Sequence, residues 1–139
     1  MLDFFGPSEK AAKAQILIVD DEPGVAQTMQ ERLEMSGYGV ITASNGKEGL
    51  AMAVEEEPDI VLLDVKMPVM DGFEMLEALR KDQEGKSRVV MMVTVSSEKE
   101  DIAQAEAYGV EDYIVKPFEL GALVEKIEGV LERRKSVAK

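Results

Sequence analysis

The sequence lacks cysteine, histidine and tryptophan. Without cysteine and histidine the chain has no disulfide, no thiol nucleophile, no imidazole acid or base, and no zinc site of the usual Cys/His kind. Any chemistry must therefore come from carboxylates, hydroxyls and amines. The chain also lacks an apolar run of roughly 18 residues and a basic start followed by an apolar segment, which excludes a membrane span or a signal peptide. We expect a soluble cytoplasmic protein.

Basic residues are few compared with acidic ones. The chain has 16 Lys and Arg against 28 Asp and Glu, a formal net charge of −12. This balance argues against direct nucleic-acid binding, which needs a basic surface, and favours divalent cations or basic partners. The length of 139 residues suits one domain. We place an N-terminal extension at 1–14, the domain at 15–133 and a C-terminal tail at 134–139.

Five apolar segments of strand length alternate with five helical patterns. The strands are expected at 15–20, 39–43, 59–64, 88–94 and 112–116. The helices are expected to start near Pro23, Asn45, Asp71, Lys99 and Leu120. This alternation is typical of α/β proteins with a parallel sheet.

Strands that read as continuous apolar runs are buried on both faces, so helices must cover both sides of the sheet. Five units are too few for a closed barrel. The sequence therefore predicts an open, doubly wound five-stranded parallel sheet in the order 2-1-3-4-5, a flavodoxin-like three-layer sandwich. Ligands of such sheets bind beyond the carboxyl ends of the strands.

Polar side chains follow the predicted strands at this edge. Asp20 and Asp21 follow the first strand, Asp64 ends the third, Thr94 the fourth and Lys116 the fifth. Two carboxylates about 4 Å apart repel each other by about 4 kcal/mol at an effective dielectric constant near 20, so the cluster needs a cation or raised pKa values. Oxygen-only ligands favour Mg²⁺, Mn²⁺ or Ca²⁺, and Mg²⁺ is typically shared with a phosphoryl group. Asp64, at the end of the central strand, is the best placed nucleophile for an aspartyl phosphate.

Four segments together resemble the receiver domains of two-component response regulators, of the chemotaxis-regulator type. The resemblance covers roughly residues 14–133. Its motifs are Val19-Asp20-Asp21-Glu22, Leu62-Leu63-Asp64-Val65-Lys66-Met67-Pro68-Val69-Met70-Asp71-Gly72, Val93-Thr94 and Tyr113-Ile114-Val115-Lys116-Pro117-Phe118. Each motif is weak alone, but all four occur in order at predicted strand ends.

The resemblance implies a metal site and a phosphoacceptor. It implies that Asp64 accepts the phosphoryl group, and that Asp21, Asp64 and the backbone carbonyl of Lys66 bind Mg²⁺ directly, with Mn²⁺ as a substitute. Asp20 would act on the metal mostly through water.

Further roles follow from the same resemblance. Lys116 resembles the lysine that pairs with the phosphate, and Thr94 the hydroxyl that moves to bond a phosphoryl oxygen. Tyr113 resembles the aromatic residue that swings inward with Thr94, completing a two-state switch. The Lys116–Pro117 peptide bond matches a position that is usually cis in the family.

Two positions are expected to modulate the lifetime of the phosphorylated state. The residue after the switch threonine is usually small in this family, but here it is Val95. Its branched side chain would obstruct the path of a hydrolytic water, so we hypothesise a long-lived phosphorylated form. Lys66, two residues after Asp64, is a second tuning position, and the sequence gives no direction for its effect.

The resemblance implies a signalling domain, with no catalysis beyond its own phosphoryl transfer and dephosphorylation. Its phosphodonor would be a sensor histidine kinase or a histidine phosphotransfer protein, because the chain itself has no histidine. An effector or a second receiver would bind the face formed by 99–107, 112–116 and the last helix. No membrane partner is expected, and the chain would be a monomer or a phosphorylation-dependent dimer.

Three alternatives remain open at this stage. A receiver-like interaction module that is not phosphorylated usually lacks one of these residues, and none is missing here. A Mg²⁺-dependent phosphatase would need a cap segment or extra loops to select a substrate. A flavodoxin-like carrier would need a glycine- and hydroxyl-rich phosphate loop after the first strand, where this chain has Asp20-Asp21-Glu22-Pro23.

Overall fold

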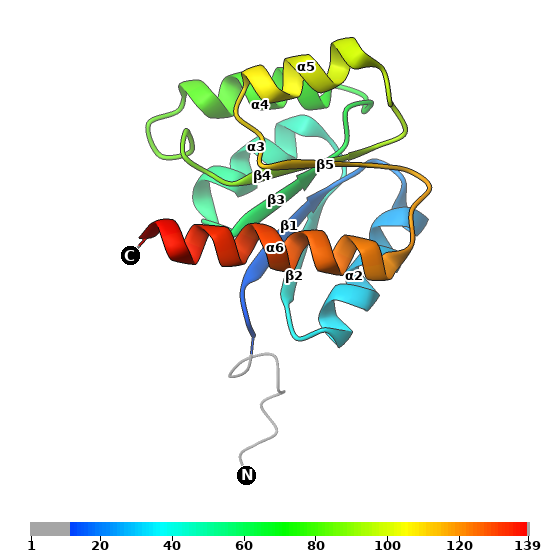
Figure 1. The fold of residues 1–139 in the computed structure, drawn as a ribbon. Coiled ribbons are helices and arrows are strands. Elements are labelled where there is room, and N and C mark those ends of the chain that lie inside the picture. Colours follow the sequence, from blue (N-terminus) through cyan, green and yellow to red (C-terminus); the bar gives the residue numbers. More distant parts are fainter. Residues whose placement is uncertain (1–11, 139) are drawn as a thin grey trace.

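A computed structural model describes residues 12–138 and shows an α/β sandwich (Figure 1). The five strands are all parallel and lie in the order β2-β1-β3-β4-β5, which confirms the predicted topology. Their bounds are β1 Gln15–Val19, β2 Gly39–Ala43, β3 Ile60–Leu63, β4 Val90–Thr94 and β5 Asp112–Val115. The helices are α2 Pro23–Met35, α3 Gly46–Glu55, α4 Gly72–Lys81, α5 Lys99–Ala107 and α6 Leu120–Ala138. Residues 1–11 of the expected N-terminal extension lie outside the described residues.

Alternate residues of the central strands face opposite sides of the sheet, because side chains alternate along a strand. In β1, Ile16 and Ile18 join a core with α2 and α6, whereas Leu17 and Val19 join a second core with α3, α4 and α5. Both cores are apolar. The continuous apolar runs in the sequence thus correspond to strands covered on both faces.

Two element boundaries differ from the sequence prediction by more than one residue. β4 begins at Val90 instead of residue 88, because the Arg88 backbone closes a turn on the Gly85 carbonyl and its guanidinium donates to the Ala53 carbonyl at 2.7 Å. At the other end of the chain, α6 continues to Ala138, so residues 134–138 are helical.

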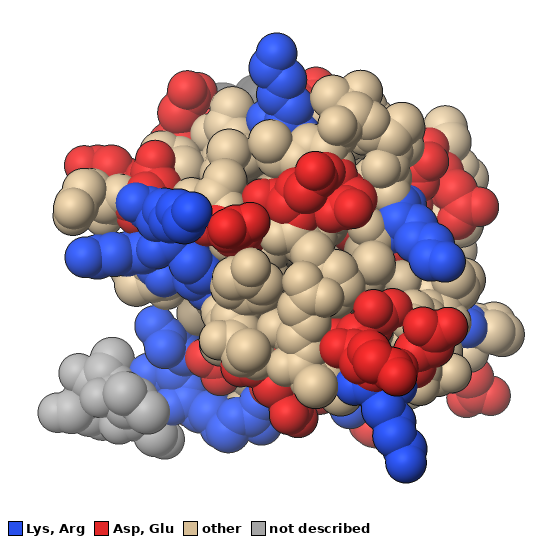
Figure 2. All heavy atoms as spheres, turned by 90° about the horizontal axis from the view of Figure 1, so that it is seen from above, with Lys and Arg blue, Asp and Glu red and all other residues tan. Residues whose placement is uncertain are grey.

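The surface over α4 and α5 has no single charged patch in view. Figure 2 shows this side with separate groups of acidic and basic side chains and uncharged surface between them. Acidic and basic side chains are therefore interspersed on this face. Among the described residues, no helix has the length and apolar character needed to cross a membrane.

Candidate functional site

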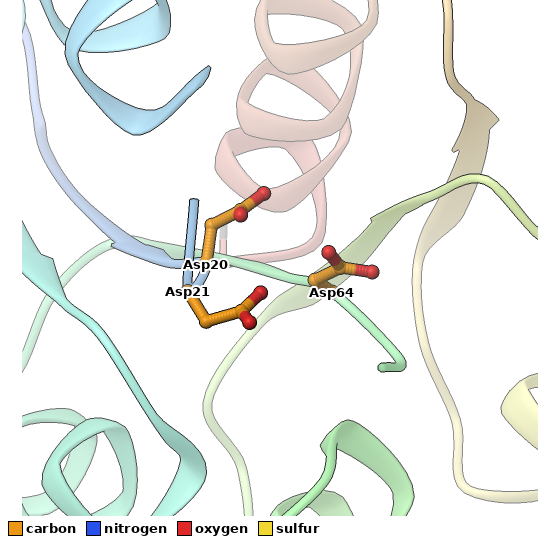
Figure 3. A group of neighbouring side chains, drawn as sticks. All are labelled: Asp20, Asp21 and Asp64. Carbon is orange, nitrogen blue, oxygen red and sulfur yellow. The ribbon is translucent and has the colours of Figure 1, made fainter. Parts of the chain in front are cut away.

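Three carboxylates meet beyond the carboxyl ends of β1 and β3. Asp20, Asp21 and Asp64 each have a carboxylate oxygen within 4.8 Å of the others, and Figure 3 shows the three side chains beside one another. The backbone places two of them: Asp20 N–H donates to the Ala43 carbonyl and Asp64 N–H to the Val19 carbonyl, both at 3.1 Å. Sheet hydrogen bonding thus continues one residue past the strands and fixes both acidic residues.

Asp64 is buried, and the loop after it folds back against it. Its Oδ1 accepts a long hydrogen bond from the Lys66 N–H at 3.4 Å. Gly72, the first residue of α4, packs against the Asp64 carbonyl so closely that a Cβ there would collide with it. The absence of a side chain at Gly72 therefore allows α4 to start beside Asp64.

Lys116 supplies the positive charge of the cluster. Its Nζ lies 2.7 Å from Asp20 Oδ2, 3.1 Å from Asp64 Oδ2 and 3.5 Å from Glu22 Oε1. The backbone of Lys116 is fixed by a 2.8 Å hydrogen bond from its N–H to the Thr94 carbonyl. The Lys116–Pro117 peptide bond is cis, the isomer that the resemblance implied.

The ionisation of Asp20 and Lys116 reflects burial and mutual attraction. Burial raises the pKa of Asp20 above its ordinary value, and the hydrogen bonds from Lys116 and from the Glu22 backbone only partly offset this rise. Burial alone would lower the pKa of Lys116, but the hydrogen bond to Asp20 and the attraction of Asp64 outweigh it and raise that pKa. Lys116 is therefore a stable cation, and the Asp20 carboxyl beside it is costly to ionise.

Thr94 and Tyr113 lie on the neighbouring strands. Thr94 ends β4 and is fully buried, and Tyr113 in β5 is half-buried. The Tyr113 hydroxyl donates to the backbone carbonyl of Ser96 at 2.9 Å. Burial raises the pKa of Tyr113, and the charge of Asp101 adds to this effect. The two residues named by the resemblance are therefore linked through the loop after β4.

The two positions expected to modulate lifetime lie at the surface. Val95 follows Thr94 with 59% of its surface exposed, and Lys66 is also exposed. The structure thus brings Asp20, Asp21, Asp64 and Lys116 together, and it leaves Val95 and Lys66 exposed.

Two residues near the site were given no role in the sequence analysis. Glu22 is the third carboxylate within reach of Lys116, and Ser96 contacts both Tyr113 and the helix that follows. Glu22 directly follows the Asp20-Asp21 pair, which is a usable signal. Ser96 has no signal in the sequence, because its contacts depend on the conformation of the loop.

An open groove leads to the carboxylates from the side of α2 and β2. It has a volume of about 600 Å³ and is lined by Asp20 and Asp21 together with residues of α2 and β2. The groove therefore opens on the acidic edge at Asp20 and Asp21, whereas Asp64, which is 6% exposed, does not line it.

Comparison with known proteins gives a consistent result. A family model described as "Response regulator receiver domain" matches residues 16–128. The transcriptional regulator RpaA of Synechocystis is 35% identical over 119 residues, covering 86% of this chain and 49% of RpaA. Protein PilH of Pseudomonas aeruginosa is 38% identical over 118 residues, covering 85% of this chain and 98% of PilH.

Solved structures agree with these sequence matches. The chemotaxis protein CheY4 of Vibrio cholerae aligns with a TM-score of 0.80 and 35% identity, covering 86% of this chain and 99% of CheY4. This chain spans about half the length of the transcriptional regulators that it matches, such as RpaA and the PrrA protein of Mycobacterium tuberculosis.

Proposed function

The chain belongs to the response regulator receiver domain family of two-component signalling, and on that premise we propose that Asp64 is its phosphoacceptor. The observation that supports this assignment is that Asp64 lies close to both Asp21 and Lys116. Its carboxylate lies in the acidic cluster and 3.1 Å from the Lys116 ammonium. No other carboxylate of the cluster directly follows the central strand β3.

The step is a transfer of one phosphoryl group. A carboxylate oxygen of Asp64 attacks the phosphorus of a phosphohistidine on the partner, the phosphorus–nitrogen bond breaks, and its electron pair stays on the imidazole, which takes up a proton. An acyl phosphate forms on Asp64. Lys116, which contacts Asp64 beforehand, is placed to pair with the oxygens of the transferred group.

The donor set fits Mg²⁺. Asp20, Asp21 and Asp64 offer only oxygen atoms, which hard divalent cations prefer, and Mn²⁺ accepts the same ligands. With the backbone carbonyl of Lys66 these residues would hold the ion. When bound, Mg²⁺ neutralises charge on the phosphoryl oxygens.

Receiver domains are signalling domains, and we infer that this one catalyses only its own phosphorylation and dephosphorylation. The partner that supplies the phosphoryl group would be a sensor histidine kinase or a phosphotransfer protein in the cytoplasm. Thr94 and Tyr113 would report the phosphorylated state to the face formed by α5, β5 and α6. An effector or a second receiver would bind there.

Beryllofluoride with Mg²⁺ tests this proposal, because it mimics an aspartyl phosphate. We expect amide NMR signals around Asp64, Thr94 and Tyr113 to shift in the wild type and in Asp59→Asn, which changes the same residue type at the opposite end of β3. The shifts should be absent in Asp64→Asn. A wild type that does not respond, under conditions where a control receiver does, would favour a receiver-like module that is not phosphorylated.

A further inference from the structure

The start of α5 is held by an unusual contact. Its N-cap residue, Glu98, makes no side-chain capping hydrogen bond. Instead, the buried hydroxyl of Ser96 accepts a hydrogen bond from Glu98 N–H at 3.3 Å and donates to the carboxylate of Asp101 at 2.5 Å. Unsatisfied N–H groups at a helix start are normally capped by the N-cap residue itself. Ser96, two residues further upstream, therefore ties the first turn of α5 to the loop after β4.

The other end of α5 is anchored separately. The guanidinium of Arg80 in α4 donates from Nε to the Tyr108 carbonyl at 2.7 Å and from Nη2 to the Gly109 carbonyl at 3.2 Å. A cation at the C-terminal end of a helix also interacts favourably with the helix dipole. Between the two ends, Ala105 is the one fully buried residue of α5. The attachment of α5 therefore depends heavily on its two ends.

Ser96 also contacts the two switch residues. Its backbone carbonyl accepts the hydrogen bond from the Tyr113 hydroxyl at 2.9 Å, and its N–H lies 3.5 Å from Thr94 Oγ1. The nitrogen, the carbonyl and the hydroxyl of one residue thus face Thr94, Tyr113 and Asp101 respectively. A shift of Thr94 or Tyr113 must displace Ser96 or break one of these contacts.

We propose that the hydrogen bond between the Ser96 hydroxyl and the Asp101 carboxylate couples Thr94 and Tyr113 to the first turn of α5. This proposal rests on the proposed function and makes Ser96 and Asp101 positioning residues of the switch. When Thr94 turns toward a phosphoryl group, Ser96 moves with the loop and pulls the first turn of α5 through Asp101. Arg80 holds the opposite end, so α5 pivots about Tyr108 and Gly109.

Hydrogen–deuterium exchange of the full chain, with and without Mg²⁺ and beryllofluoride, tests the coupling. In the wild type, we expect ligand-dependent change in the amides of the first turn, residues 99–102, and little change near Tyr108. Ser96→Ala and Asp101→Ala should lose this response while still binding beryllofluoride at Asp64. Ser96→Thr, which keeps the hydroxyl, should retain it. The exposed neighbours provide matched controls, Ser97→Ala and Glu100→Ala.

The same variants also test the contact between Ser96 and Asp101 in the absence of ligand. In the unmodified protein, loss of one hydrogen bond should speed exchange of the first-turn amides by about fivefold in Ser96→Ala and Asp101→Ala, but not in the two controls. Exchange equal to that of the controls, or an unchanged ligand response in Ser96→Ala, would overturn the proposal. A wild type that does not bind beryllofluoride refutes the proposed function instead, and the ligand-free exchange still tests the contact.

Discussion

The ammonium group of Lys116 lies 3.1 Å from the Asp64 carboxylate, although 52 residues separate them in the chain. β3 and β5 are not neighbours in the sheet, and β4 lies between them. Lys116 directly follows the end of β5, and its long side chain crosses this gap to contact both Asp20 and Asp64. One cation therefore holds together the acidic residues that follow two other strands.

Replacing Lys116 with methionine should destabilise the protein more than the same change at an exposed ion pair. Its removal leaves the buried carboxylates of Asp20 and Asp64 without their cation, and we expect a loss of about 2–3 kcal/mol in metal-free buffer. Lys126→Met is the matched control, because its pair with Asp112 at 3.3 Å is more exposed and is worth less than about 1 kcal/mol. Denaturant unfolding measures both, and equal losses would contradict the role of Lys116.

Asp20→Asn should raise stability at neutral pH when no divalent cation is present. Burial raises the folded-state pKa of Asp20 above 3.8, so the folded protein favours the neutral carboxyl. The stability that the neutral Asp20 carboxyl contributes to the fold is fully present below about pH 3.8 and is lost as the pH rises through the folded-state pKa. The asparagine keeps the neutral form at every pH.

Thermal unfolding in a chelator checks this expectation. The melting temperature of Asp20→Asn should exceed that of the wild type at pH 7, and the difference should shrink at acid pH. Added Mg²⁺ should stabilise the wild type more than the variant. The exposed Asp59, changed to Asn, serves as the control. A less stable Asp20→Asn in the chelator would show that ionised Asp20 favours the fold.

Val69→Gly should stabilise the protein by about 1 kcal/mol. Val69 has φ of 71°, a conformation that a β-branched residue adopts only with strain, and 78% of its surface is exposed, so little packing compensates. Val95→Gly is the control: Val95 is also exposed, but its φ is not positive. Chemical denaturation should show a gain for Val69→Gly and a loss of about 0.5–1 kcal/mol for Val95→Gly. A loss in both would mean that Val69 makes stabilising contacts.

Val95→Ala should shorten the life of the phosphorylated form several-fold. Val95 directly follows Thr94 and is 59% exposed, and its branched side chain would hinder an attacking water. Loss of the acyl phosphate after removal of the donor is the measurement. Val69→Ala, at an exposed valine in the loop after β3, is the control. Identical decay in the wild type and Val95→Ala would contradict the hypothesis.

The topology and the central residues could be predicted from the sequence because both depend on simple periodicities. Apolar strand segments that alternate with helical patterns define the parallel sheet, and the carboxyl ends of its strands share one edge. Asp20, Asp64 and Lys116 were therefore expected together. In the structure, both Asp20 and Asp64 lie within hydrogen-bonding distance of Lys116.

The contacts of the loops could not be predicted in the same way. The capping of α5 by Ser96 and the contact between Glu22 and Lys116 depend on loop conformation and side-chain rotamers, which no periodic pattern encodes. The end of α6 was also missed, because residues 134–138 have no apolar periodicity that marks them as helical. Beyond Val130, Leu131 packs against the core and Arg134 lies 3.9 Å from Glu111, and neither contact follows from a periodic pattern.

Phosphorylation of Asp64 is the central claim, and intact-protein mass measurement after incubation with acetyl phosphate and Mg²⁺ tests it most directly. We predict a gain of one phosphoryl group in the wild type and in Asp59→Asn, with the modified peptide containing Asp64. The gain should disappear with a chelator and in Asp64→Asn. Equal modification of Asp64→Asn, or an unmodified wild type beside a modified control receiver, would contradict the account.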